Sequence, residues 1–288
     1  MMNYREPLFR PPAEADSLIF QVAYGCPHNS CRFCMMYKTV RYQERPLEKV
    51  LAEIKAAGRR YADARRVFLA DGEVMFLDYS VLKLILTALN QALPRLARVN
   101  VYANGTAIMA KTAGQLRELR DFKLNTLYLG LETGDQKLLD LVNKRETVDA
   151  MVAAVRLAQD CGLKCSVMAL LGLAGKNGSA GHAQQTAEAL NRMQPRLLSF
   201  LRFIEVPGVN MFPGYEAVTE YEAVRELRQM LAALELERTV FRANHSSNPA
   251  PLEGRFPQDK QKLLEEVDGL LRSSRLDRQG PGHLPFWL

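Results

Sequence analysis

The chain has 288 residues, of which 48% are hydrophobic and 24% charged, and 38 Lys and Arg face 32 Asp and Glu for a formal net charge of +6. This composition excludes a disordered chain and a collagen-like one. No apolar run approaches the roughly 18–20 residues that span a bilayer, and the first residues, MMNYREPLFRPPAEAD, lack the apolar segment of a secretory signal. We therefore expect a globular, cytoplasmic protein with no membrane partner.

The positive charge is spread along the chain. Its densest group is Arg59, Arg60, Arg65 and Arg66, and acidic residues stand close by. A mild basic excess mainly keeps a protein soluble, and no basic stripe interleaved with aromatic residues indicates a nucleic-acid surface. Nucleic acid is therefore retained only as a weakly supported alternative partner.

Short β-type runs alternate with longer helical patterns along the first two thirds of the chain. In chain order we expect strand 18–23, helix 46–57, strand 66–70, helix 79–93, strand 98–103, helix 113–121, strand 126–131, helices 135–143 and 148–161, strand 164–171, helix 183–193 and strand 197–204. Each of these six strands is followed by a helical segment. Such alternation predicts a parallel sheet with right-handed crossovers.

Six units are too few for a closed eight-fold barrel, so the pattern predicts an α/β fold, a partial (β/α)6 TIM-like barrel open on one side. We expect an N-terminal arm over 1–16, the barrel core over 17–205, and a mostly helical C-terminal extension over 206–288. The extension contains helical patterns at about 216–237 and 258–273. Gly, Asp, Glu and Asn recur directly after the strands, at the edge where parallel α/β folds bind ligands.

Three of the five cysteines, Cys26, Cys31 and Cys34, lie within nine residues at C-x4-C-x2-C spacing. An odd number of cysteines in a cytosolic chain argues against a disulfide framework. With a fourth ligand the three thiolates would hold zinc, and without one they would hold a cubane iron–sulfur cluster with one open iron. His28 is only two residues from Cys26, which is awkward for a shared tetrahedron, so the cluster is the simpler interpretation. The other two cysteines, Cys161 and Cys165, are expected in the core.

The cysteine loop and its neighbours resemble the radical S-adenosylmethionine superfamily over roughly residues 17–205. The resemblance rests on the strand before the loop, on Phe33 directly before the last cysteine, and on the turn Asp71-Gly72-Glu73 after the second strand. The segments LYLGLETGD at 127–135 and LVNKRET at 141–147 are similar to the branch with oxygen-independent coproporphyrinogen oxidase and the Elongator catalytic subunit. The usual spacing is C-x3-C-x2-C, so the extra residue here suggests a distinct subfamily.

This resemblance implies a 4Fe-4S cluster whose fourth iron is chelated by the amino and carboxylate groups of S-adenosylmethionine. One electron, from a donor such as flavodoxin or ferredoxin, would cleave the sulfonium to give methionine and a 5′-deoxyadenosyl radical. That radical would abstract hydrogen from an unidentified, polar substrate. Two alternatives remain within the same fold, an RNA-modifying enzyme and a non-catalytic haem or cluster chaperone.

The resemblance also assigns residues to S-adenosylmethionine. The turn Asp71-Gly72-Glu73 matches the family's Gly-Gly-Glu position and would take up the methionine ammonium, Glu132 the ribose or methionyl group, Lys144 the methionine carboxylate, and Asn104 the ribose; Phe33 flanks the cluster. Each also has a purely structural interpretation: a β–α turn, a helix cap, a surface lysine and an Asn-Gly turn. Met168 stands where coproporphyrinogen oxidases carry an acidic residue, which argues against that particular reaction.

A polar group near the C-terminus has no helical or strand pattern. Arg242, Asn244 and His245 stand in the segment 239–249 with Ser246 and Asn248. A dense polar loop is either a solvated linker or a lid over a binding site. We expect a lid whose side chains contact the substrate.

Overall fold

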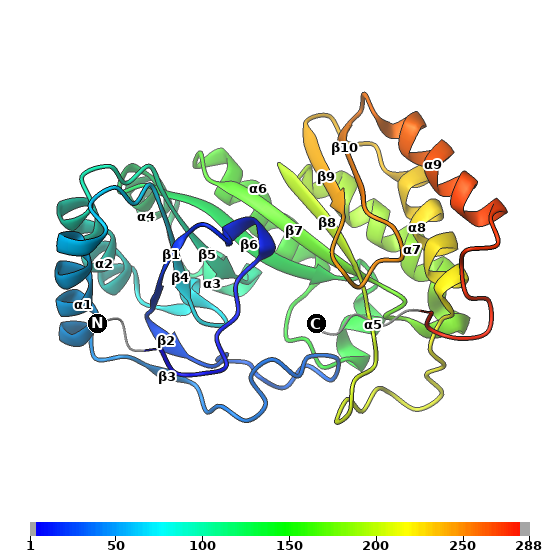
Figure 1. The fold of residues 1–288 in the computed structure, drawn as a ribbon, viewed down its shortest axis with the longest axis horizontal. Helices are drawn as coiled ribbons and strands as arrows, with labels where there is room; N and C mark the ends of the chain where they lie inside the picture. The colour runs from blue at the N-terminus through cyan, green and yellow to red at the C-terminus, as the bar shows by residue number, and fades with distance from the viewer. Residues whose placement is uncertain (1–3, 283–288) are drawn as a thin grey trace. The chain divides into compact units, whose positions relative to one another are not determined.

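The computed structural model describes residues 4–282, which form an α/β fold (Figure 1). Its strands are β1 Leu18–Gln21, β2 Ala23–Tyr24, β3 Gln43–Glu44, β4 Arg66–Ala70, β5 Arg98–Ala103, β6 Leu124–Glu132, β7 Lys164–Leu171, β8 Leu197–Arg202, β9 Thr239–Ala243 and β10 Leu252–Phe256. Its helices are α1 Leu47–Arg60, α2 Tyr79–Ala92, α3 Gly105–Met109, α4 Ala113–Asp121, α5 Gln136–Leu141, α6 Val148–Asp160, α7 Gly175–Met193, α8 Glu220–Ala233 and α9 Lys260–Arg272, with 3-10 turns η1 Pro12–Glu14 and η2 Val74–Phe76.

Eight strands form one sheet in the order β1-β4-β5-β6-β7-β8-β9-β10, and β2 pairs separately with β3. The pairs β1–β4, β4–β5, β5–β6, β7–β8 and β8–β9 are parallel, whereas β10 runs antiparallel to β9. Parallel neighbours need a crossover, and helices supply it between successive strands. The sheet has two edges, so it is a partial TIM-like barrel, as predicted.

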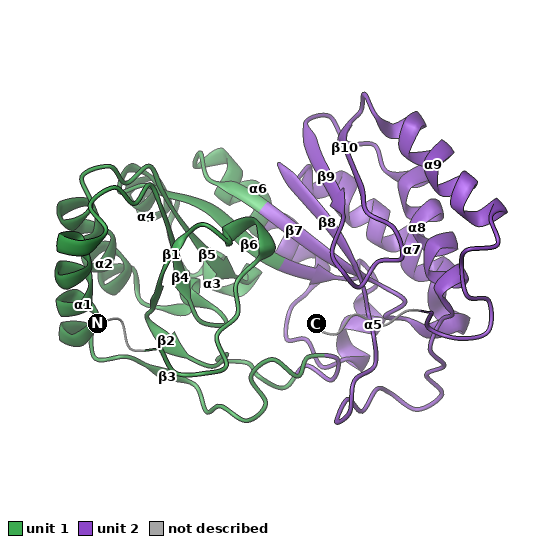
Figure 2. Cartoon of the chain, viewed as in Figure 1, with its two compact units in different colours: residues 1–30, 34–129, 154–165 green, residues 31–33, 130–153, 166–288 purple. Residues whose placement is uncertain are grey.

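The chain divides into two compact units (Figure 2). Unit 1 comprises residues 1–30, 34–129 and 154–165, and unit 2 comprises residues 31–33, 130–153 and 166–288. The boundaries cross the cysteine loop, β6, α6 and β7. Each unit is described by itself below.

The core of unit 1 lies between the strands β1, β4 and β5 and the helices α1 and α2. Helix α1 buries Val50, Ile54 and Ala57, which share one face because they are spaced by four and three residues. The helix continues to Arg60, past the expected end at residue 57. Gly58 does not end it, because a Cβ there would lie 2.5 Å from the Ala92 carbonyl oxygen of α2, so the glycine permits close helix packing instead.

The N-terminal arm is anchored within unit 1 by a buried carboxylate. Glu14, in η1, is 1% exposed. Its Oε1 accepts hydrogen bonds from Asn100 Nδ2 at 2.7 Å and from the Tyr128 hydroxyl at 2.5 Å, and its Oε2 accepts one from Ser17 at 2.5 Å. The arm therefore closes one side of the strands β5 and β6 rather than hanging free.

In unit 2 the prediction of a loop over residues 239–249 is wrong for its first half, which is a strand. Residues Thr239–Ala243 form β9, which pairs with β8 through Leu197↔Val240 and Leu198↔Phe241. Thr239, Phe241 and Ala243 are buried, a period-two pattern that the polar residues after it obscured. The C-terminal extension thus contributes the strands β9 and β10 as well as α8 and α9.

Among residues 4–282, no helix is long and apolar enough to cross a membrane.

Candidate cofactor site

The five cysteines separate into two kinds by exposure. Cys26, Cys31 and Cys34 are partly exposed, whereas Cys161 and Cys165 are buried, as predicted for core residues. Cys165 donates to the Val155 carbonyl oxygen at 3.8 Å, and burial raises the pKa of its thiol to about 12. Because a thiolate is the metal ligand, these environments favour the loop cysteines and disfavour Cys165.

The loop supplies three thiols, the donor type and number that a cubane iron–sulfur cluster with one open iron requires. None of the five cysteines, all in the described part of the chain, forms a disulfide. Within residues 4–282, no three His, Cys, Asp or Glu side chains lie close enough together to hold one metal ion. A cubane cluster makes a different demand, because each of its three thiolates binds a separate iron and the sulfurs need not converge on one point.

In unit 1 the turn after β4 lies directly against the first cysteine. The Gly72 amide donates to the Gly25 carbonyl oxygen at 3.1 Å. A Cβ on Gly72 would lie 2.8 Å from the Cys26 Cβ and 2.9 Å from the Gly25 carbonyl oxygen. Only glycine fits this approach without moving the loop. The turn predicted to bind S-adenosylmethionine and the first predicted cluster ligand are therefore neighbours.

The carboxylate of Asp71, in the same turn, accepts hydrogen bonds from other side chains of the protein. It is 1% exposed and accepts hydrogen bonds from Gln21 Nε2 and from the Tyr37 hydroxyl, both at 2.7 Å. Burial raises the pKa of Asp71, although the hydrogen bonds from Tyr37 and Gln21 act in the opposite direction. This side chain holds the distal part of the cysteine loop to β1. Sequence reasoning missed Tyr37 and Gln21, since both are far from Asp71 in the chain.

Glu73 and Asn104, predicted separately after two strands, meet in unit 1. Asn104 Nδ2 donates to Glu73 Oε2 at 2.9 Å, and Glu73 is 6% exposed. The parallel strands β4 and β5 are neighbours, so the residues that follow them share one edge of the sheet. A buried carboxylate at this edge suits a cationic ligand group.

The inner part of the cysteine loop is closed by Asn29. Its side-chain Nδ2 donates to the Tyr37 carbonyl oxygen at 2.6 Å and to the Val40 carbonyl oxygen at 3.2 Å. Its φ of 34° is left-handed, a conformation that asparagine tolerates better than most residues. The sequence offered no cue to this role beyond the residue type.

In unit 2 Glu132 and Lys144, each predicted to bind S-adenosylmethionine, form a nearly buried ion pair. Lys144 Nζ lies 2.9 Å from Glu132 Oε1, with side chains 8% and 12% exposed, and it also donates to the Gly130 carbonyl oxygen. Burial acts to lower the pKa of Lys144, but the charges of Glu132 and of Cys31 outweigh it and raise the pKa. Lys144 is thus a buried cation, not the surface lysine of the structural alternative.

The backbone conformation around Glu132 leaves room for this ion pair. Glu132 has a φ of 64°, in the left-handed region that ordinary residues rarely adopt. A Cβ on Gly130 would lie 1.8 Å from Glu132 Oε1, so the glycine leaves the space that the carboxylate occupies. Thr133, the next residue, bonds the buried His182 ring at 2.7 Å, a contact that the sequence analysis did not foresee.

Phe33 and the loop residue before it are fixed within unit 2. Phe33 packs against an apolar cluster that includes Leu138, Val142 and Met211. The Arg32 amide donates to the Val142 carbonyl oxygen at 2.8 Å. The segment that carries Cys31 is therefore held by the turn after α5.

The three predicted substrate residues do not form one loop. Arg242 lies in β9 and is exposed, Asn244 is exposed, and the half-buried His245 bonds Ser247 through Nδ1 at 2.9 Å. Asn248 donates to the Phe200 carbonyl oxygen at 2.8 Å, so the turn is fastened to β8. Met168 is half-buried in β7.

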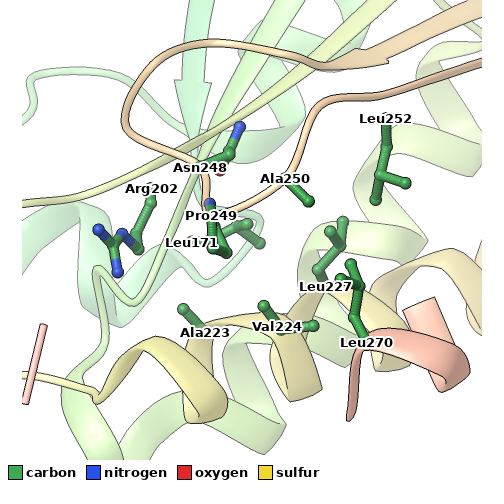
Figure 3. Close-up of a pocket in the computed structure, with 10 residues that line it drawn as sticks. All are labelled: Leu171, Arg202, Ala223, Val224, Leu227, Asn248, Pro249, Ala250, Leu252 and Leu270. Atoms are coloured by element: carbon green, nitrogen blue, oxygen red, sulfur yellow. The ribbon is translucent and has the colours of Figure 1, made fainter. Parts of the chain in front are cut away.

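A small cavity of about 10 Å³ lies beneath this turn in unit 2 (Figure 3). It contains none of the residues predicted to bind cofactor or metal; apolar side chains such as Leu171 and Leu227 line it beside Arg202 and Asn248. Among the described residues, the buried Asn248 Oδ1 has no hydrogen-bond partner. The space is about that of one water molecule, so the cavity is too small for a substrate.

The sequence of the chain is similar to those of a known family and of one curated protein. The family model described as Radical SAM superfamily matches residues 20–180, more than half of the chain. Anaerobic magnesium-protoporphyrin IX monomethyl ester cyclase of Rubrivivax gelatinosus is 26% identical over 200 residues, which cover 66% of this chain and 33% of that protein. The chain thus spans about a third of the length of this curated relative.

Solved structures resemble the fold at low sequence identity. The radical S-adenosylmethionine methyltransferase TsrM from Kitasatospora setae matches with a TM-score of 0.55 and 17% identity, covering 81% of this chain and 43% of that one. Methylornithine synthase matches with a TM-score of 0.53 and 16% identity, and the match covers 88% of this chain and 81% of that one. Coproporphyrinogen III oxidase from Escherichia coli matches with a TM-score of 0.51 and 14% identity, and the match covers 88% of this chain and 52% of that one.

Proposed function

The chain belongs to the radical S-adenosylmethionine superfamily, whose cofactors are a 4Fe-4S cluster and S-adenosylmethionine, and from this membership we propose that it is an enzyme that cleaves S-adenosylmethionine reductively. When bound, the cluster would supply the electron for reductive cleavage of S-adenosylmethionine, which would give methionine and a 5′-deoxyadenosyl radical able to abstract hydrogen. An external donor such as flavodoxin or ferredoxin would deliver that electron. The close approach of Gly72 to Cys26 supports the proposal, because it sets the turn proposed to bind S-adenosylmethionine beside a proposed cluster ligand.

Each residue of the proposed site has a task that its environment supports. Cys26, Cys31 and Cys34 would each bind one iron. The backbone of the turn at Gly72 and the Glu73 carboxylate would bind the methionine ammonium, since a buried carboxylate forms strong charge-assisted hydrogen bonds. Asn104, which bonds Glu73, would orient that carboxylate and donate to the ribose.

For the ion pair in unit 2, a role in binding S-adenosylmethionine is proposed from the family resemblance. Lys144 keeps its charge in a buried position and would attract the methionine carboxylate. Glu132 is fixed by Lys144 and would accept hydrogen bonds from ribose hydroxyls. Phe33 would pack beside the cluster and exclude water from it.

We also retain Asn244 and His245 as proposed substrate contacts. They follow β9 directly, and β9 is parallel to β8, so they stand at the carboxyl end of a parallel strand. Arg242, inside the strand and exposed, is the weakest member of that set.

The test is anaerobic reconstitution with iron and sulfide, followed by S-adenosylmethionine, reductant and a metabolite extract. The extract is supplemented with a porphyrin methyl ester, because the curated relative is named for a cyclase of such an ester. An enzyme forms 5′-deoxyadenosine faster with its substrate present. A haem chaperone would bind haem without substrate-dependent 5′-deoxyadenosine, and that result would contradict the proposal.

A further inference from the structure

Helix α7 carries a buried histidine, His182, that the proposed site does not use. The residue is 0% exposed. Its Nδ1 lies 2.7 Å from the Thr133 hydroxyl and 3.2 Å from the Thr186 hydroxyl. Its Nε2 lies 3.0 Å from the Leu170 carbonyl oxygen of β7. A carbonyl oxygen only accepts, so Nε2 donates to β7, and Nδ1 is left to face the two threonines.

Thr133 directly follows Glu132, and both belong to a γ-turn at the end of β6. The Thr133 amide donates to the Leu131 carbonyl oxygen at 2.8 Å, and Glu132 between them has a φ of 64°. A γ-turn with positive φ at its central residue is rare and strained. Such strain persists only where the surrounding structure fixes it, and it is found mainly at functional sites. The turn at Glu132 therefore needs support from its neighbours.

Buried hydroxyl groups supply that support to the residues that follow the turn. Thr133 Oγ1 accepts a hydrogen bond from the Asp135 amide at 3.0 Å. Thr186 Oγ1 accepts one from the Gly134 amide at 3.0 Å. Both threonines are 0% exposed. Because His182 and Thr186 are four residues apart, they share one face of α7, and this face holds the chain directly after Glu132.

The His182 ring is fixed from its other side by an acid of α8. Glu226 is also 0% exposed, and its Oε1 lies 3.5 Å from His182 Nε2. The same oxygen accepts a hydrogen bond from the Gly172 amide at 2.7 Å, and Oε2 accepts one from the Ser179 hydroxyl. A buried polar network in which each group has a partner is rigid. The ring therefore cannot turn away from the threonines without losing its contacts with β7 and α8.

We propose that His182 and Thr133 are positioning residues, which hold the γ-turn at Glu132 and thereby fix its carboxylate for the ribose of S-adenosylmethionine. The inference rests on the proposed function, in which Glu132 accepts hydrogen bonds from ribose hydroxyls. Neither positioning residue touches the cofactor, since both are fully buried. Lys144 holds the side chain of Glu132 by its charge, and the two residues hold its backbone.

The experiment measures the affinity of two ligands for the anaerobically reconstituted protein by equilibrium titration. The ligands are S-adenosylmethionine and its analogue without the 2′ and 3′ ribose hydroxyls, which has no hydroxyl to offer to Glu132. Thr133→Val removes the hydroxyl that faces His182, and Thr133→Ser keeps it. Thr239→Val is the matched control, because Thr239 is 2% exposed and its hydroxyl donates to the Pro195 carbonyl oxygen at the amino end of the parallel strands.

Two variants of His182 separate the roles of its nitrogens. The side-chain amide of asparagine reaches as far as Nδ1, and that of glutamine reaches as far as Nε2. His182→Asn thus keeps a group for Thr133 and loses the one for the Leu170 carbonyl oxygen, whereas His182→Gln does the reverse. We therefore expect His182→Gln to behave like Thr133→Val, and His182→Asn to keep the ligand affinities of the unchanged protein.

The expected result is a loss that depends on the ribose hydroxyls. We expect Thr133→Val and His182→Gln to weaken S-adenosylmethionine binding about tenfold, a typical effect of losing one hydrogen bond to a charged group. Binding of the analogue stays unchanged in both variants. Thr133→Ser, His182→Asn and Thr239→Val retain both affinities. A merely structural role would weaken both ligands equally, or would make the affinities follow thermal stability across all five variants, and either result would overturn the inference.

Glu132→Gln separates this inference from the proposed function. If it weakens binding of S-adenosylmethionine and not of the analogue, while Thr133→Val and His182→Gln change neither, the positioning role is wrong and the proposed role of Glu132 stands. If Glu132→Gln leaves both affinities unchanged, the proposed role of Glu132 fails and the inference falls with it. Thermal unfolding of each variant identifies a folding defect, and Thr133→Ala replaces Thr133→Val if that variant does not fold.

Discussion

Lys144 reaches from the residues after α5 to Glu132 at the end of β6, and its Nζ lies 2.9 Å from Glu132 Oε1 with both side chains nearly buried. An ion pair in this setting is sensitive to the loss of one member, because the other charge is left buried and uncompensated. Its two residues stand twelve positions apart in the chain, and both were assigned to cofactor binding by resemblance.

Breaking that pair should cost both stability and cofactor affinity. We expect Glu132→Gln to lower the free energy of unfolding by about 3 kcal/mol, as for other buried pairs that lose one partner. Replacing both residues, as in Glu132→Gln with Lys144→Met, should cost less than the single change. Chemical denaturation of both single variants and the double variant measures this, and a double-variant loss equal to the sum of the two single losses would show that the two charges are not coupled.

The three loop cysteines should each be required for the cluster. We expect about four irons per chain and absorbance near roughly 400 nm after anaerobic reconstitution, both abolished by alanine at Cys26, Cys31 or Cys34. Cys161→Ala and Cys165→Ala are the matched controls, since these two cysteines are buried in the core. Iron and sulfide analysis decides the matter, and loss of iron in either control would mean that the ligands are assigned wrongly.

Glu73 should contribute to S-adenosylmethionine binding and not to cluster assembly. We expect Glu73→Ala to retain iron and to bind S-adenosylmethionine about ten- to hundredfold more weakly, the equivalent of about 1.5–3 kcal/mol for a hydrogen bond to a charged group. Glu118→Ala, an exposed carboxylate in the same unit, serves as the control. Unchanged affinity in the Glu73 variant would leave this residue only a role in the turn.

Gly72 should be intolerant of any side chain. A Cβ would have to fit 2.8 Å from the Cys26 Cβ, so we expect Gly72→Ala to displace the cysteine and to lower iron content. Gly114→Ala is the matched comparison, because the nearest atom to a Cβ there, Thr112 Oγ1, would be 3.8 Å away. Full cluster content in Gly72→Ala would show that the loop adjusts without loss.

Tyr37 should stabilise the fold of unit 1 through Asp71. Its hydroxyl donates to a carboxylate that is 1% exposed, and a hydrogen bond to a charged group contributes about 1.5–3 kcal/mol. We therefore expect Tyr37→Phe to reduce the free energy of unfolding by about that amount, as measured with denaturant. A change under about 0.5 kcal/mol would fit a surface substitution and contradict this role.

The sequence predicted the bounds of secondary structure best where an element is a short apolar run. Strands β4, β5 and β7 have the predicted bounds, since each is a short apolar run bounded by polar residues or glycine. The start of α7 at Gly175 was missed, because three glycines and several polar residues precede the apolar stripe at Ala183. Strand β9 was missed for a similar reason, since Arg242 and Asn244 gave its end a polar character.

The site could be predicted only as far as the chain shows it locally. The cysteine spacing and the residues after each strand were evident, so Glu73 and Asn104 could be named before their contact was known. Tyr37 and Gln21 could not, because their shared partner Asp71 is brought to them by packing between distant segments. Buried polar residues of this kind look like ordinary surface residues in a sequence.

The longer interval between the first two cysteines can be understood from Asn29. Its amide group fastens the loop to Tyr37 and Val40 from within, and its left-handed backbone turns the chain between Cys26 and Cys31. In this loop the longer interval therefore contains a side chain that bonds back to the loop's own backbone. A search for chains that share this arrangement can use the signature C-x2-N-x-C-x2-C, which includes the asparagine.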